Sequence, residues 1–334
     1  MSSVSVRKYG DGFVVRYGRR KLGLDTGFEG GTTLLSHSHM DHVGGLKLAD
    51  LVVGTSGTFD TLKARGGRVR GGKLTLNYGE SYTIDQIKIT VLNAGHVLGS
   101  SMFKIEIGNG PSILYTGDFN IVDSLVHTGA HASDADVLIT EATYGDPSWV
   151  FPERKGVYEN IITETKRLQE ENKIPVLKAY SLGKAQEAIG LLNKNGMETI
   201  SGNYSIDAVS DIYRKHGKEI QFLKLTDEET PAILTGEGVV ISSSIRHTLL
   251  NVRKNLGRAL AKELHNKMVV LSLSGWTLGK YREEGFPLSA HTDFPGLIRF
   301  AEEVNPRLAY CFTENGNTLA MHLSNNGIQA VPLG

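Results

Sequence analysis

The stretch HSHMDH, residues 37–42, holds four residues of metal-ligand type in six positions. Residues at i and i+2 on a strand end share one face, so His37 and His39 can hold one ion. Asp41 and His42 follow in the next loop and can hold a second. Imidazole and carboxylate ligands at this density suit zinc, or failing that manganese or iron. The stretch therefore predicts a metal centre.

Two residues further along the chain have the local setting of additional ligands. His96 lies in AGHVLGSS after the apolar run ITVLNA, and Asp118 lies in ILYTGDF after another apolar run. A sheet fixes the loops at its strand ends, so polar residues there commonly build sites. A carboxylate such as Asp118 can bridge two metals about 3.5–4 Å apart. A lone histidine is usually an ordinary polar residue, and the density of ligand types at 37–42 is what favours ligation here.

The elements that must position these residues are short strands followed by an alternating α/β segment. Two β-rich runs around Asp11-Gly12 predict a hairpin, and Asn109-Gly110 predicts another. Beyond residue 150 the pattern turns helical and then alternates strand with helix, which is typical of a parallel α/β unit. The pattern predicts a split first domain interrupted by an inserted domain, with boundaries at 1–150, 151–267 and 268–334.

Composition excludes several classes of protein. The 334 residues carry 36 basic and 36 acidic side chains, so a grossly basic nucleic-acid binder is excluded, although a local basic groove is not. No run of 18 apolar residues exists, so a membrane-spanning helix is not expected. The N-terminal residues lack the apolar core of a secretory signal. The single cysteine, Cys311, allows no internal disulfide, and a cytoplasmic location is expected.

The motifs resemble those of a known family. HSHMDHVGG resembles the HxHxDH motif of the metallo-β-lactamase superfamily. AGHVLGSSMFKIEIGNGPSILYTGDF resembles the next two motifs in its nucleic-acid-processing branch, the β-CASP nucleases. TEATYGD, IPVLKAYSLGKAQEAIGLL and LSAHTDFPGL are similar to later segments of that branch, in order, across about residues 32–323. The branch includes Artemis-type DNA nucleases, ribonuclease J, the cleavage and polyadenylation nuclease subunit, archaeal RNA 3′-end processing exonucleases and ligase-associated DNA exonucleases.

The resemblance implies an α/β fold, a metallo-β-lactamase αββα sandwich with an inserted α/β β-CASP domain. It implies one or two zinc ions, with manganese as the alternative. One ion would be held by His37, His39, His96 and Asp118, and the other by Asp41, His42 and Asp118.

The resemblance also implies zinc-dependent hydrolysis of phosphodiester bonds, with Asp41, Glu141 and His291 as catalytic residues. Zinc would activate a water for in-line attack on phosphorus. His291 would bond the phosphate or protonate the departing oxygen, and Glu141 would orient a ligand or fix the protonation of His291. The implied partner is nucleic acid, single-stranded or at an end, and not a membrane. Relatives often dimerise, so a homodimer is an open expectation.

One segment departs from the pattern of the β-CASP ribonucleases. Many of these carry a late histidine in a context like VHGE, whereas residues 311–316 read CFTENG. The second ion would then be weakly held, or take water or Glu314 instead. Artemis-type DNA nucleases also lack this histidine, and LSLSGWTLGKYREEGFPLSAHTDFPGL resembles ligase-associated DNA exonucleases. These features favour DNA over RNA, and an exonuclease in DNA repair is expected. An RNA-processing exonuclease or endonuclease of the same family is the alternative, and the polarity of cleavage and endonuclease against exonuclease action stay open.

Substrate contacts and two other functions stay open. In SLGK, Ser181 and Lys184 at a helix start could meet a phosphate, or Ser181 could be a plain N-cap. In SSSIRH, Ser243 and Arg246 could line the same cleft or form an ordinary loop. A small-molecule metallohydrolase of the same fold is one alternative, disfavoured by the inserted segment. A non-catalytic nucleic-acid-binding paralogue is the other, disfavoured because the expected ligands are intact.

Overall fold

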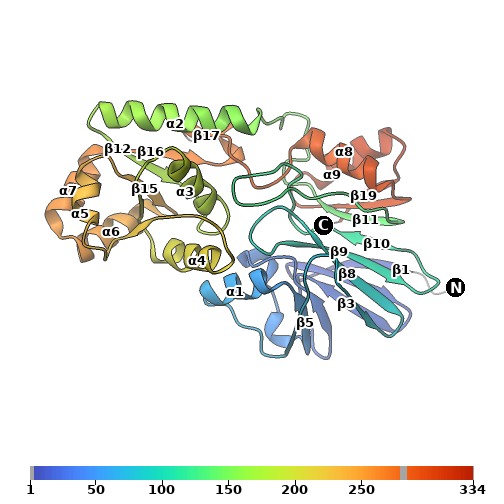
Figure 1. Ribbon diagram of the computed structural model, residues 1–334. Helices are drawn as coiled ribbons and strands as arrows, with labels where there is room; N and C mark the ends of the chain where they lie inside the picture. The colour runs from blue at the N-terminus through green and yellow to red at the C-terminus, as the bar shows by residue number, and fades with distance from the viewer. Residues whose placement is uncertain (1–3, 279–283, 334) are drawn as a thin grey trace. The chain divides into compact units, whose positions relative to one another are not determined.

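The structure is a computed structural model that describes residues 4–278 and 284–333, and it divides into two compact units. The second unit is inserted into the sequence of the first (Figure 1). The first unit comprises Met1–Asp123, His127–Val150 and Ala290–Gly334, and the second comprises Ser124–Val126 and Phe151–Ser289.

One sheet of the first unit begins with a hairpin. Strands β1 and β2 are antiparallel with Tyr9 opposite Gly12, which confirms the hairpin predicted around Asp11-Gly12. β3 pairs antiparallel with β2, and β3 to β6 then pair in parallel. The six strands follow in chain order across the sheet: β1 (Val4–Tyr9), β2 (Gly12–Tyr17), β3 (Arg20–Leu24), β4 (Thr32–Leu34), β5 (Leu51–Gly54) and β6 (Gly72–Thr75).

The other sheet of the first unit combines strands from both ends of the chain. Its order is β19-β18-β11-β10-β9-β8-β7, antiparallel from β7 to β10 and parallel from β10 to β19. The strands β9 and β10 flank the turn predicted at Asn109-Gly110. The strands of this sheet are β7 (Ser81–Ile84), β8 (Ile87–Asn93), β9 (Ser101–Ile107), β10 (Ile113–Tyr115), β11 (Val137–Glu141), β18 (Leu308–Phe312) and β19 (Ala330–Pro332).

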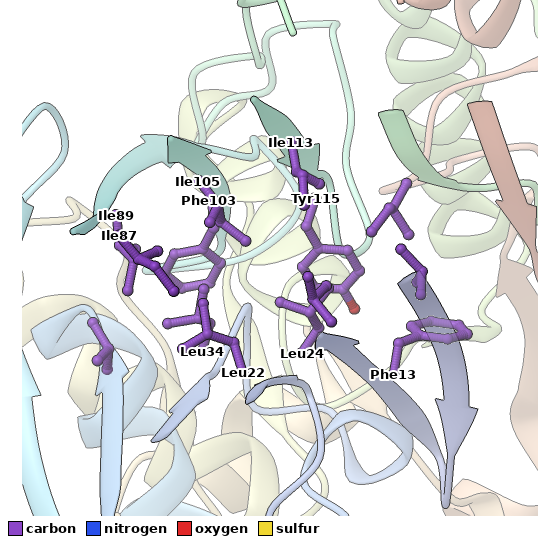
Figure 2. Packing of buried hydrophobic residues seen from close by; sticks show 14 of the residues in the cluster. Phe13, Leu22, Leu24, Leu34, Ile87, Ile89, Phe103, Ile105, Ile113 and Tyr115 are labelled. Carbon is purple, nitrogen blue, oxygen red and sulfur yellow. The ribbon is translucent and has the colours of Figure 1, made fainter. Parts of the chain in front are cut away.

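The core of the first unit lies between these sheets. Figure 2 shows Leu22, Leu24 and Leu34 of the first sheet facing Phe103 and Tyr115 of the second. Each fully buried side chain of this size contributes about 1.5–3 kcal/mol. The outer faces are covered by helices, α1 on the first sheet and α8 and α9 on the second: α1 (Ser56–Ala64), α8 (Phe294–Val304) and α9 (Gly316–Asn325). This layering confirms the expected αββα sandwich and the α/β fold class.

The second unit is built on one wholly parallel sheet with the order β14-β13-β15-β12-β16-β17. Apolar strand segments alternate with amphipathic helices, as the sequence predicts. The strands are β12 (Ile174–Lys178), β13 (Thr199–Ser201), β14 (Leu223–Lys224), β15 (Val239–Ser242), β16 (Met268–Leu273) and β17 (Gly285–Phe286). The helices are α2 (Arg154–Glu170), α3 (Lys184–Lys194), α4 (Tyr204–Lys215), α5 (Thr230–Thr235), α6 (Ile245–Asn255) and α7 (Arg258–Lys267).

The end of the second unit differs from the boundary expected at residue 267. β16 pairs in parallel with β12, with Val270 opposite Val176, so this strand completes the second unit's sheet. The chain returns to the first unit at Ala290. Among the described residues, none of the helices is both long enough and apolar enough to cross a membrane.

Candidate metal centre

The ends of four strands of the first unit carry the chemically active side chains, three of them through the loops that follow. The 37–42 segment follows β4 and ends in a short 3-10 turn, Met40–His42. His96 follows β8, Asp118 follows β10, and Glu141 is the last residue of β11. The structure brings these residues together, although the chain separates the first from the last by about a hundred positions.

Four of the predicted ligands converge on one point. The first donor set consists of His37, His39, His96 and Asp118, whose donor atoms all lie within 4.8 Å of one another. His39 Nδ1 is 3.0 Å from His37 Nε2 and 3.1 Å from His96 Nε2. The Asp118 Oδ2 atom is 3.6 Å from His37 Nε2 and 3.8 Å from His96 Nε2. Tetrahedral ligands 2.0–2.1 Å from a zinc ion are separated by about 3.3 Å, which falls within this range.

Hydrogen bonds on the far side of two of the rings assign their imidazole tautomers. His96 Nδ1 donates to the Ala290 carbonyl at 2.9 Å, which leaves the Nε2 lone pair facing the donor set. His37 Nδ1 lies 3.0 Å from Ser36 Oγ, and because Ser36 donates its own proton to Asp25, the imidazole is the donor. Rings fixed in this way present ligand lone pairs to a common centre.

The electrostatics of the first donor set also fit a cation. Burial lowers the pKa of His39 to about 3, and burial also lowers the pKa values of His37 and His96 well below the ordinary value. The three rings are therefore neutral, and their ring nitrogens lie about 3 Å apart around one point, a spacing that a cation between them would occupy. Burial opposes ionisation of Asp118, but His42 and His291 hold its pKa well below the usual range. Three neutral imidazoles and a carboxylate are a fitting ligand set for zinc.

The second donor set, Asp41, His42 and Asp118, is less closed. His42 Nε2 lies 3.4 Å from Asp118 Oδ1 and 3.8 Å from Asp41 Oδ2. The Asp41 side chain is 78% exposed, whereas His42 is buried. Within the described part of the chain, these three residues do not form a group with every donor atom inside 4.8 Å. The second position is therefore only partly arranged.

The two residues expected to act beside the metal contact each other directly. His291 Nδ1 lies 2.9 Å from Glu141 Oε2, and the His291 ring packs against His96 with centroids 4.6 Å apart. Glu141 is buried and accepts the Phe119 N–H at 2.8 Å, immediately after Asp118. One carboxylate thus fixes both the His291 ring and the backbone that carries Asp118.

Asp25 is a site residue that the sequence analysis missed. Its buried carboxylate accepts the His42 Nδ1–H at 2.7 Å, the Tyr115 hydroxyl at 2.7 Å and the Ser36 N–H at 2.6 Å. Burial lowers the pKa of His42, but the carboxylates of Asp118 and Asp25 raise it well above its ordinary value. Asp25 directly follows β3, which pairs in parallel with β4 beside it. An acidic residue at the end of a strand that neighbours the histidine strand was the available signal.

Comparison with known proteins identifies the domain that carries these residues. The model of the β-lactamase superfamily domain matches residues 29–176, a range that contains both donor sets and Glu141. In three dimensions the chain resembles the crystal structure of a protein of unknown function from Enterococcus faecalis, with a TM-score of 0.62 and 12% sequence identity. That alignment covers 100% of this chain and 97% of the other, and it supports the fold.

Curated relatives are similar to parts of the chain of different length. RNase aCSPSF2 of Saccharolobus solfataricus is 30% identical over 186 residues, covering 48% of this chain and 37% of the relative. Endoribonuclease ysh-1 of Neurospora crassa is 36% identical over 148 residues, covering 42% and 17%. The chain therefore contains a metallo-β-lactamase domain and is similar to relatives of the β-CASP nuclease family. A probable DNA ligase of Opitutus terrae is 28% identical over 318 residues, or 93% of this chain and 29% of that protein. The chain spans well under half the length of these curated relatives.

The expected substrate contacts of this protein lie in its second unit and do not all meet. Ser181 and Ser243 line one cavity, of which Lys184 and Arg246 are not among the lining residues. Lys184 is buried, and Arg246 is exposed on α6. The N-cap of α3 is Gly183, so the alternative of a plain N-cap by Ser181 is wrong.

The late segment of this metallo-β-lactamase fold holds no replacement for the missing histidine. Glu314, the suggested substitute, is exposed and belongs to none of the ligand groups found among the described residues. Thr313 instead accepts the Ala142 N–H at 3.0 Å, directly after Glu141. The segment therefore supports the Glu141 loop and not a second ion.

Proposed function

We propose that the protein is a metal-dependent phosphodiesterase that hydrolyses polynucleotides from an end. The convergence of the first donor set beside the paired His291 and Glu141 carries the proposal. Burying three neutral imidazoles and a carboxylate at one point costs folding free energy unless a cation balances them. The nucleases among the relatives support phosphodiester bonds as the target.

The first donor set would hold zinc, and the second donor set would hold a further ion more weakly. Manganese is the alternative for the oxygen-rich second position. When bound, the metal polarises a phosphoryl oxygen and lowers the pKa of a water molecule at the site. The protein's own contribution is to fix the ligand rings through Asp25, Ser36 and the Ala290 carbonyl.

His291 is the residue placed to move a proton. Its Nδ1–H is held by Glu141, so its Nε2 atom can bond a phosphate oxygen. When Nε2 carries a proton, it can pass that proton to the departing oxygen as the phosphodiester bond breaks. Glu141 acts through His291 and through the backbone beside Asp118, and it is a positioning residue in this proposal.

DNA is the proposed polymer. The probable DNA ligase matches 93% of this chain, whereas each ribonuclease match reported above covers 48% or less. The absence of a histidine from CFTENG at residues 311–316 points the same way. RNA processing is the alternative, since the names of the other relatives favour it. Cytoplasmic location and a homodimer stay predictions.

The test is a cleavage time course on end-labelled single-stranded DNA and RNA of one sequence, with zinc or manganese and with a chelator. We expect a chelator-sensitive ladder that develops faster on DNA. Asp118→Ala should lower the rate by about 100-fold or more, because Asp118 belongs to both donor sets. Asp50→Ala, which removes an exposed carboxylate of the same unit, should leave the rate unchanged.

Three outcomes would contradict parts of the proposal. Cleavage of RNA alone would overturn the preference for DNA and retain the nuclease. Full activity in Asp118→Ala would overturn the assignment of the site. Hydrolysis of a lactone or thioester without cleavage of either polymer would replace the nuclease with a small-molecule metallohydrolase.

A further inference from the structure

The second unit contains a cavity of about 460 Å³ that the proposed chemistry does not use. Its lining includes two aromatic side chains, Tyr180 and Trp276, four serines and one lysine, Lys178. Tyr180 is 62% exposed and Trp276 is 43% exposed, values that are high for large rings. The volume lies within the range of about 300–1,000 Å³ typical of small-molecule sites.

The cavity lies where the topology of the parallel sheet favours a ligand. Strands β15, β12 and β16 are neighbours, and each is followed by a serine of the cavity: Ser243, Ser181 and Ser274. The chain leaves β12 through α3 toward β13, and it leaves β15 through α6 and α7 toward β16 on the other side of β12. Ligands of open α/β sheets bind at the carboxyl ends of strands where connections diverge in this way.

Hydrogen bonds beneath the cavity hold its rim in place. The buried Asn203 side chain accepts the Ser243 N–H at 2.7 Å and the Ser243 hydroxyl at 3.2 Å. On the opposite side, the Ser274 N–H donates to the Phe286 carbonyl at 3.1 Å, and the Ser274 carbonyl accepts the Thr277 hydroxyl at 2.9 Å. The rim is therefore preorganised, which lowers the entropy cost of binding.

The chemistry of the lining selects the ligand. Lys184 places its ammonium 4.7 Å from the Tyr180 ring centroid, and Lys178 lines the cavity itself. Among the described lining residues there is no carboxylate. One lysine, hydroxyl groups and exposed aromatic faces without acidic groups suit a ligand that combines an anion with a flat ring. Base stacking on aromatic side chains is how proteins hold single strands without reading their sequence.

We infer that this cavity binds one nucleotide of a single-stranded polynucleotide, with the base stacked on Tyr180 or Trp276. The phosphate and sugar then face the serine hydroxyls and Lys178. The inference names a binding position for the substrate class of the proposed function and rests on that function for the choice of a polymer over a free nucleotide.

The chain supplies its own reporter, because its two tryptophans are Trp149 and Trp276. In a Trp149→Phe background, Trp276 emission is titrated with a thymidylate tetramer and a uridylate tetramer, with excess chelator to prevent cleavage. An abasic tetramer with the same number of phosphates and free thymidine monophosphate form the comparison. We expect saturable quenching by the tetramers and none by the abasic strand, with weaker binding of the monophosphate.

A series of variants separates stacking from folding. Tyr180→Ala should raise the dissociation constant by about 5- to 150-fold, the range for loss of one stacked base. Tyr180→Phe retains the ring and should bind like the parent. Tyr9→Ala removes a comparably exposed tyrosine from the first unit and should have no effect.

The results distinguish this inference from the proposed function. Quenching without hydrolysis of any polynucleotide would support the binding position and overturn the proposed activity. Normal hydrolysis with no change in Trp276 emission, and an unchanged KM in Tyr180→Ala, would overturn the binding position alone. Equal quenching by the abasic strand would also overturn it, because phosphate contacts would then explain the binding.

Discussion

The two units use the ends of their strands in different ways. In the first unit, imidazole and carboxylate atoms of the first donor set approach one another to between 3.0 and 3.8 Å. In the second unit, hydroxyl groups and aromatic rings surround a cavity of about 460 Å³. Bond breaking requires atoms fixed within fractions of an ångström, whereas sequence-tolerant binding needs area and flat surfaces. Under the proposed function, the first unit would carry out the reaction and the second unit would bind the polymer.

The same contrast exists inside the metal centre. The first donor set is buried or half-buried and closed, whereas the second donor set depends on an exposed Asp41. Asp118 is common to both sets. A closed set should retain its ion when free metal is scarce, and an open set should exchange its ion readily. The largest expected effects test this difference.

Removing one ligand from each donor set should give unequal losses of bound metal and of cleavage rate. His39→Ala should lower metal affinity by about 100-fold or more and bring cleavage to the level seen with chelator, because a central ligand is lost. Asp41→Ala should retain the first ion and lose about 10-fold in rate. Metal content after dialysis against limiting zinc, measured with the cleavage rate, checks both values. Equal losses of metal in the two variants would remove the distinction between the sets.

Loss of the Asp25 carboxylate should lower metal affinity almost as much as loss of a metal ligand. Asp25→Asn keeps the shape of the side chain but removes the charged acceptor that holds His42 Nδ1–H. We expect metal affinity to fall by about 10- to 100-fold, in line with other residues that orient a ligand ring. A competition titration against a coloured chelator measures the change. Asp50→Asn, an exposed carboxylate in the same unit, is the matched control and should titrate like the parent.

Much of this site could be predicted because the signals are local. HSHMDH places four residues of metal-ligand type together in the sequence, and His96 and Asp118 each follow an apolar strand. Asp25 has no such pattern, because its role arises from contacts such as that with Tyr115, ninety residues away. A single carboxylate after a strand looks the same whether it faces water or supports a metal ligand. Only the pairing of β3 with β4 reveals the difference.

The same reasoning explains which parts of the fold the sequence could predict. The helix α3 and the β1–β2 hairpin follow from periodicity and turn residues within one short window. The strand β16 was also recognisable, but its assignment to a unit depends on β12, about ninety residues earlier. The sequence of an apolar strand does not indicate which other strand it pairs with. The boundary expected at residue 267 therefore falls before a strand that belongs to the second unit.

The last prediction concerns charge in the second unit. Lys184 is buried, and burial lowers its pKa to about 8 from the ordinary 10.5, although Glu187 opposes and Arg154 adds to the shift. Glu187 is itself bonded to Arg154 and Tyr158. Because the folded pKa is the lower one, the unfolded chain binds more protons between pH 8 and 10.5, and stability rises with pH there. The gain is up to about 3 kcal/mol.

The measurement is the difference in urea midpoint between the parent and Lys184→Met from pH 7 to 11. Burial raises the pKa values of Cys311 and Tyr115, and these groups lower stability as pH rises, but they do so equally in both proteins and cancel in the difference. We expect the advantage of Lys184→Met to be greatest near pH 7 and to shrink as the parent loses its buried proton. A constant difference across this range would mean that the Lys184 ammonium is solvated or fully paired. In that case burial in the second unit would not shift the pKa of Lys184.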